Sequence, residues 1–172
     1  MANSPHTAIS SGAEARVHGA RPGASKAIAT IVVAIDGPGN AGNVLATATG
    51  LASQTPSATV HVVHVLRSAR LDHARAGVPA TPAAELARVV EYLEQQVQTT
   101  RMLCANQVVG HFAVGSPVDE IVRVCKETRA DVVVVGDPDR HGLERLLLGS
   151  LAATLIRNAP CSVLVVRPPV AH

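Results

Sequence analysis

The sequence predicts an α/β fold, an open parallel sheet of five strands with helices on both faces. Two observations lead to this prediction. Short runs rich in valine and isoleucine alternate along the chain with segments whose apolar residues recur at helical spacing. The short runs are apolar at nearly every position, which is typical of strands buried between two layers of helices. Strands that alternate with helices in this way pair in parallel, with right-handed crossovers.

The first strand begins where the composition changes abruptly, near Ala27. Residues 28–35 form a β-branched run that ends in Asp36-Gly37-Pro38-Gly39, a sequence with strong turn chemistry. The apolar residues that follow have the spacing of a helix with one buried face. These residues are Val44, Leu45, Ala48, Leu51 and Ala52. A second strand, as apolar as the first, is expected at 59–66.

The second half of the chain repeats this alternation. Residues 67–81 contain Gly77 and Pro79 and are expected to form a long connection. The helix after it extends to about Leu103, with apolar positions at Leu86, Val89, Val90, Leu93 and Val97. The remaining expected elements are a strand at 107–114, a helix at 118–128, a strand at 131–136, a helix at 149–158 and a strand at 162–166.

Composition limits what the protein binds. Hydrophobic residues make up 47% of the 172 residues, but the chain has one Tyr, one Phe and no Trp, so its core must be aliphatic. So few aromatic rings argue against single-stranded nucleic acid, whose bases stack on such rings. A net charge of only +2 argues against any long phosphate backbone. No apolar run approaches the roughly 20 residues that span a bilayer, so we expect no membrane partner and a soluble, cytoplasmic protein.

Domain boundaries also follow from composition. Residues 1–26 mix small, polar and basic residues without periodicity and are expected to be a disordered extension. They contain no apolar stretch of at least about seven residues, as a cleavable secretory signal would require. A single domain is expected over 27–168, followed by a short tail at 169–172.

The cysteines and histidines do not have the spacing of a metal site. Cys104, Cys125 and Cys161 are odd in number, far apart and set in apolar patterns, so we expect buried thiols in a reducing compartment. His61 and His64 lie three residues apart on an expected strand and should point to opposite faces of the sheet. The sequence therefore predicts neither a disulfide nor a structural metal.

Two glycine-containing loops form the candidate ligand site. The first covers residues 36–42, and the second runs from Gly136 to Ser150. In an open parallel sheet, ligands bind beyond the C-terminal ends of the strands, where the strand order reverses, so both loops should meet there. Glycine lets the backbone approach a ligand closely, and each loop leads into a helix N-terminus, which favours anions.

Four segments in the last forty residues of the domain form a specific pattern. They are Asp131-Val132-Val133-Val134-Val135-Gly136, Gly142-Leu143, Leu146-Leu147-Leu148-Gly149-Ser150 and the run from Asn158-Ala159-Pro160 to Val166. This pattern resembles the C-terminal half of the universal stress protein family, whose fold is of the adenine nucleotide alpha hydrolase type. Weaker matches upstream are Gly115-Ser116-Pro117, His64-Val65 and Val33-Ala34-Ile35-Asp36-Gly37, so the resemblance covers about residues 27–168.

The resemblance implies a strand order of 3-2-1-4-5 and an adenine nucleotide as ligand, namely ATP, AMP or cyclic AMP, with or without Mg²⁺. Asp36 and the backbone of Val65 would hold the adenosine. Gly136 would begin the phosphate cradle, and Gly149 and Ser150 would close it. It also implies a homodimer through the last strand and a regulatory role in the stress response. No catalytic residue is expected, although slow ATP hydrolysis stays open.

One position departs from the family pattern. The second glycine of the phosphate motif should fall at residue 139, where this chain has Asp139, next to Asp137 and Pro138. Two carboxylates beside a triphosphate would repel it by about 1 kcal/mol per close pair in bulk water and by more where they are partly buried. We therefore expect weakened phosphate binding and a preference for AMP or a cyclic mononucleotide, unless Mg²⁺ bridges Asp139 to a phosphate.

Other functions stay open on the sequence alone. Gly37, Gly39 and Gly42 match the dinucleotide fingerprint, and Arg67 could accept the 2′-phosphate of NADP, but no catalytic acid or base supports an oxidoreductase. A regulatory dimer that binds no nucleotide is the second alternative. Single residues also have structural alternatives, since Asp36 and Ser150 could simply cap helices, and the motif glycines could serve only tight turns.

Overall fold

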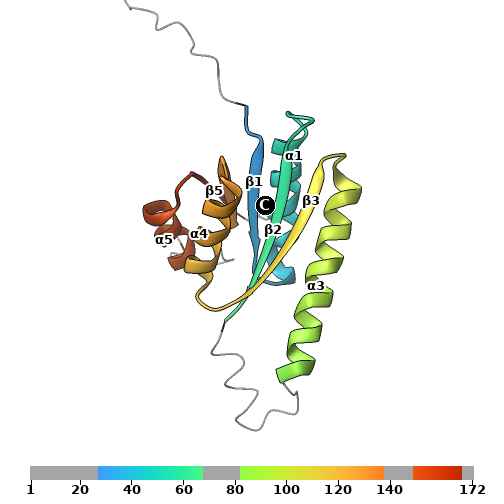
Figure 1. Cartoon of the computed structure of the whole chain (residues 1–172), viewed down its shortest axis with the longest axis vertical. Helices are drawn as coiled ribbons and strands as arrows, with labels where there is room; N and C mark the ends of the chain where they lie inside the picture. Colours follow the sequence, from blue (N-terminus) through green and yellow to red (C-terminus); the bar gives the residue numbers. More distant parts are fainter. Residues whose placement is uncertain (1–26, 68–81, 138–148, 168–172) are drawn as a thin grey trace, which may run out of the picture.

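The structure is a computed structural model that describes residues 27–67, 82–137 and 149–167. Strands and helices alternate strictly over these residues (Figure 1). The elements are β1 (Thr30–Ile35), α1 (Pro38–Ala52), β2 (Thr59–Leu66), α3 (Pro82–Leu103), β3 (Gln107–Val114), α4 (Pro117–Thr128), β4 (Val132–Gly136), α5 (Ser150–Asn158) and β5 (Ser162–Val166). The extension and the tail expected at the two ends lie outside the described residues.

The five strands form one parallel sheet with the order β3-β2-β1-β4-β5, which confirms the predicted fold. Successive strands are added in one direction from β1 to β3, and the chain then returns to place β4 on the other side of β1. The strand order therefore reverses between β1 and β4, where Ile31 is paired with Val132 and Ala34 with Val135.

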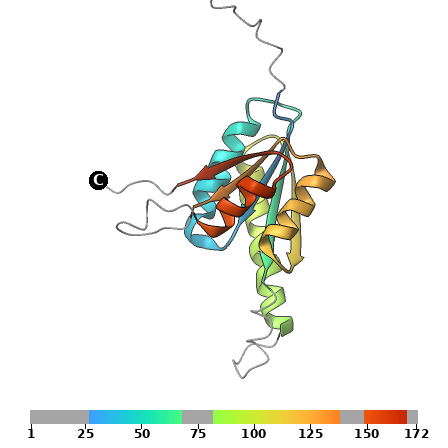
Figure 2. The ribbon, with the colours of Figure 1, turned by 90° about the vertical axis from the view of Figure 1, so that its left-hand side faces the viewer.

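Aliphatic side chains fill a layer on each face of the sheet. On one face, Val33 and Val62 are buried with residues of α1 and α3. On the other, Val32 and Val63 are buried with residues of α4 and α5. Figure 1 shows these two helix pairs on opposite sides of the sheet, and Figure 2 views the molecule from the side of α4 and α5. Within the described residues, no helix is both long and apolar enough to cross a membrane.

Four elements begin one or two residues away from their predicted starts: β1, α4 (Pro117 instead of 118), β4 (Val132 instead of 131) and α5 (Ser150 instead of 149). The strand expected to begin at residue 28 begins at Thr30, because the carboxylate of Asp131 accepts the N–H groups of Ala29 and Thr30, each at 2.9 Å. The long helix begins at Pro82, before the first apolar residue of its pattern, Leu86. Proline is favoured in the first turn of a helix, where its missing N–H leaves no hydrogen bond unmade.

The cysteines depart in part from the expectation of buried thiols. All three are free, but Cys125 alone is fully buried, whereas Cys104 and Cys161 are partly exposed. Cys125 belongs to the core between the sheet and the helices α4 and α5, with Cys161 packed against it. Burial, with a smaller effect of Cys161, raises the pKa of Cys125 to about 12, so this thiol stays protonated and unreactive at neutral pH.

The histidines of β2 point to opposite faces of the sheet, as predicted. His64 is buried, contacts the ring of Tyr92 in α3 and forms a hydrogen bond between its Nδ1 and the carbonyl of Ile35 at 2.9 Å. His61 lies on the other face, where its Nδ1 is 2.8 Å from Nε2 of His111 in β3. No group of three or more metal-binding side chains gathers anywhere in the described part of the chain.

We predict that the pair of His61 and His111 makes stability depend on pH. Burial and the neighbouring charge of His111 lower the pKa of His61 below 6.5; burial and Arg123 lower that of His111, while Glu127 partly opposes this. Between the folded and unfolded pKa values the unfolded chain binds more protons, so stability falls as pH falls. The contribution of the pair should be complete above about pH 7 and lost progressively below about pH 6.5.

Urea unfolding at about pH 7.5 and about pH 5 measures this effect. The wild-type protein should lose more stability on acidification than a double variant, His61→Gln with His111→Gln, whose side chains do not titrate. An equal loss in both proteins would mean that other groups cause the pH dependence.

Candidate functional site

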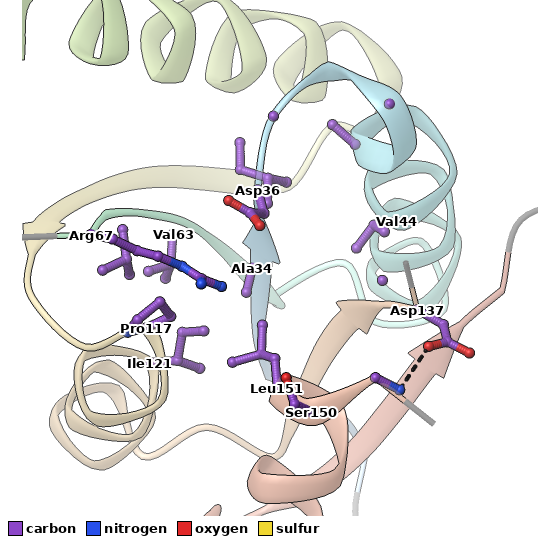
Figure 3. A pocket seen from close by; sticks show the side chains of 17 residues that line it. Ala34, Asp36, Val44, Val63, Arg67, Pro117, Ile121, Asp137, Ser150 and Leu151 are labelled. Atoms are coloured by element: carbon purple, nitrogen blue, oxygen red, sulfur yellow. Dashed lines mark hydrogen bonds between the residues drawn. The ribbon is translucent and has the colours of Figure 1, made fainter. Parts of the chain in front are cut away.

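A pocket of about 420 Å³ opens at the C-terminal ends of β1, β2 and β4, beside the reversal in strand order (Figure 3). This volume lies within the range of small-molecule sites. Residues at the ends of these three strands and at the starts of α1, α4 and α5 line it. The two loops that the sequence singled out therefore meet at one pocket, as far as their residues are described.

The end of β1 contributes an exposed carboxylate. Asp36 directly follows the strand, and Gly37 turns the chain into α1 with a φ of 101°, a conformation that favours glycine. The Asp36 side chain lines the pocket close to the apolar side chains of Ala34 and Val63 (Figure 3). After burial, the charge of Asp36 is the second cause that raises the pKa of Tyr92 in α3.

The end of β2 extends beyond that of β1. The ladder between these strands ends with the pair of Ile35 and His64, so the backbone of Val65 lies past its last rung. The Val65 side chain is only 8% exposed and lines the pocket together with Val63. Arg67 follows the strand, and its exposed side chain extends across the pocket (Figure 3).

The third wall is built around Asp137, which is only 5% exposed. Its carboxylate Oδ1 accepts the N–H of Gly149 at 3.0 Å, and Oδ2 lies 3.4 Å from Nε of Arg167. Its own N–H donates to the carbonyl of Val166 at 2.8 Å. Asp137 thus joins the ends of β4 and β5 to the start of α5, and Gly136 and Ser150 line the pocket on either side of it.

This arrangement changes the expected role of Asp137. From the sequence it was one of two carboxylates that repel a phosphate. In the structure its charge is shared with Arg167 and with the N–H of Gly149, which is one of the backbone groups assigned to the phosphate cradle. A phosphate must therefore displace this carboxylate before it can use the N–H of Gly149.

Five of the six residues assigned to the site line the pocket: Asp36, Val65, Gly136, Gly149 and Ser150. Asp139, the sixth, lies outside the described residues. Sequence reasoning missed the wall made by α4, where Pro117 and Ile121 line the pocket. The four-residue spacing of these two residues after Gly115-Ser116 was the available signal, because positions one helical turn apart share a face.

The pocket combines features that suit one class of ligand. Valine, isoleucine and leucine side chains offer an apolar wall for a flat ring. Asp36 is an acceptor for hydroxyl groups, and Arg67 is a cation. The N-termini of α1 and α5, where the glycine at the N-cap forms no side-chain capping hydrogen bond, add backbone N–H groups that favour an anionic group. A phosphorylated nucleoside has a ring, hydroxyls and an anion in this combination.

Comparison with known proteins gives a family match over nearly the whole domain. The sequence model described as Universal stress protein family matches residues 28–167. A universal stress protein from Methanocaldococcus jannaschii is 49% identical over 55 residues, which cover 32% of this chain and 32% of that relative. The chain thus aligns with about a third of this relative's length.

Solved structures share the fold. A universal stress protein from Archaeoglobus fulgidus in complex with dAMP is 27% identical, with a TM-score of 0.59 over 81% of this chain and 98% of that one. A universal stress protein in complex with cAMP is 24% identical, with a TM-score of 0.61 over 83% of this chain and 99% of that one. Because the structure with cAMP is only 24% identical to this chain, its similarity shows a shared fold and nothing more.

We predict that the carboxylate of Asp137 stabilises the protein. Asp137→Ala should lower the free energy of unfolding by about 1–3 kcal/mol, because it removes a buried acceptor from the N–H of Gly149. Arg167→Ala should lower the free energy of unfolding by at most about 1 kcal/mol, since the Arg167 side chain is 63% exposed. Denaturant unfolding measures both. A loss in Asp137→Ala no larger than that in Arg167→Ala would contradict the prediction.

Proposed function

Because the chain belongs to the universal stress protein family, we propose that it binds an adenine nucleotide in the pocket beside the strand reversal and acts as a regulatory protein of the stress response. The observation that supports this most strongly is the meeting of Asp36, Val65, Gly136, Gly149 and Ser150 around one pocket of about 420 Å³. The dAMP named for the 27% identical solved structure from Archaeoglobus fulgidus supports an adenine nucleotide as ligand.

The adenosine part of the ligand lies against β1 and β2 in this proposal. The side chains of Val63 and Val65 form an apolar surface against which a purine packs. The backbone of Val65, beyond the last rung of the ladder with β1, is placed to bond the polar edge of the base. The carboxylate of Asp36 accepts hydrogen bonds from the ribose hydroxyls.

The phosphate part points toward the start of α5. Ser150 opens this helix with an exposed side chain, and its hydroxyl and the N-terminal N–H groups are donors for phosphate oxygens. The Asp137 carboxylate, which accepts the N–H of Gly149, lowers the attraction of this side of the pocket for phosphate. The aspartate at position 139 is expected to lower it further. AMP or cyclic AMP is therefore the proposed ligand ahead of ATP, whose extra phosphates need Mg²⁺ or a rearranged loop.

Assembly and location complete the proposal. β5 lies at one edge of the sheet, where it pairs with β4 alone, and each of its residues keeps some exposed surface. An exposed strand edge is a template for pairing, which supports a homodimer through β5. We propose the cytoplasm as the location of this dimer. The protein in this proposal is not an enzyme. Calorimetry with NADPH tests the alternative of an NADP-dependent oxidoreductase, which predicts that NADPH binds and AMP does not.

We predict that calorimetry detects AMP and cyclic AMP binding in the micromolar to millimolar range, with about 1:1 stoichiometry per chain. Asp36→Ala should lower the affinity for adenosine and for both nucleotides by about tenfold or more, because a charge-assisted hydrogen bond to the ribose is lost. Glu94→Ala, which removes an exposed carboxylate of α3 away from the pocket lining, should change nothing. Absence of binding by adenosine and by every nucleotide would leave the regulatory dimer without nucleotide as the function.

We predict that Asp139→Gly strengthens ATP binding more than AMP binding, because the substitution restores the motif glycine and removes a negative charge expected beside the outer phosphates. The gain should be several-fold for ATP without Mg²⁺ and smaller with it. Calorimetry on both proteins in matched buffers measures the difference. Equal ATP affinities would show that the carboxylate does not face the phosphates.

A further inference from the structure

Arg67 is a pocket residue for which the family pattern gives no role. It directly follows β2, two residues beyond Val65, so its side chain leaves the sheet on the same face as that of Val65. In Figure 3 the guanidinium extends into the pocket, toward the space between Asp36 and Leu151. Arg67 forms no ion pair or hydrogen bond with any other described residue.

The guanidinium of Arg67 lies between the ribose side and the phosphate side of the proposed site. Asp36 lies on the side assigned to the ribose, and Leu151 follows Ser150 at the start of α5, on the side assigned to the phosphates. The first phosphate of a nucleotide is bonded directly to the ribose. It therefore occupies the space between these two sides, which is the space that the guanidinium enters (Figure 3).

The charges around the pocket also direct an anion toward Arg67. On the α5 side, the buried carboxylate of Asp137 already accepts the N–H of Gly149, and the guanidinium of Arg167 lies beside it. On the β2 side, the arginine is next to the apolar side chains of Pro117 and Ile121. Apolar walls reduce screening by water and strengthen a contact between guanidinium and phosphate.

We infer that Arg67 binds the first phosphate of the nucleotide and makes the site selective for nucleosides with a single phosphate group, either a 5′-phosphate or a cyclic phosphate. The inference rests on the proposed function and deepens it. A guanidinium donates two parallel hydrogen bonds to one phosphate, so much of the affinity gained from phosphate comes from this contact. Further phosphates extend toward α5, where, among the described residues, the carboxylate of Asp137 already accepts the N–H of Gly149.

A ligand series separates this contact from the rest of the site. Binding of adenosine, 5′-AMP, cyclic AMP, 2′-AMP and ATP is measured by calorimetry, with NMR titration for ligands in the millimolar range. The wild-type protein should bind 5′-AMP and cyclic AMP about tenfold or more tightly than adenosine. ATP without Mg²⁺ should bind no more tightly than 5′-AMP.

Arg67→Gln is the decisive variant, since it keeps a polar side chain and removes the charge. Its affinity for 5′-AMP should fall about tenfold, close to that for adenosine, while adenosine itself changes less than about twofold. Arg67→Lys should retain part of the gain, because an ammonium keeps the charge without the paired geometry. Arg88→Gln, the same change at an exposed arginine of α3 outside the pocket lining, should leave all affinities unchanged.

Three results would overturn the inference. Equal losses for adenosine and 5′-AMP in Arg67→Gln would place the arginine on the base or the ribose. An unchanged affinity for 5′-AMP would remove Arg67 from the site. A larger loss for 2′-AMP than for 5′-AMP would favour recognition of a 2′-phosphate, as in NADP. Failure of the proposed function gives a different result, since the wild-type protein would then bind neither adenosine nor any nucleotide.

Discussion

The reversal of strand order between β1 and β4 is the constraint on which the pocket depends. The chain leaves β1 into α1 on one face of the sheet and leaves β4 toward α5 on the other face. Because α1 and α5 lie on opposite faces, a crevice forms at the C-terminal end of the sheet between these strands, and the pocket opens there. The short β1–β4 ladder, from Ile31 to Ala34, thus holds the ends of these two strands, Asp36 and Gly136 included, beside one pocket.

Asp137 connects the stability of the fold with the chemistry of the pocket. By accepting the N–H of Gly149, it fixes the N-cap residue of α5 against the ends of β4 and β5. A carboxylate that accepts a helix N-terminal N–H occupies the place that a ligand anion would otherwise take. The same contact that holds the helix start in place therefore lowers the attraction of this side of the pocket for phosphate.

The charged groups divide the pocket into regions with different chemistry. Asp36 provides an acceptor near the apolar wall of β2, whereas Arg67 provides a cation toward the centre (Figure 3). A carboxylate and a guanidinium in one pocket favour a ligand that carries hydroxyl groups and an anionic group close together. A nucleoside monophosphate fits this distribution better than a long polyphosphate, whose charge extends beyond the reach of one arginine.

Apolar periodicity and turn residues such as Asp36-Gly37 are local properties, so the elements, their parallel pairing and the loops that would meet could be predicted from the sequence. The direction of individual side chains became visible only in the folded chain. The structure showed Asp137 bonded to Gly149 across the pocket wall, Arg67 extending into the pocket, and α4 supplying a wall through Ile121. These depend on contacts between segments far apart in the chain, and no pattern within one segment encodes such contacts.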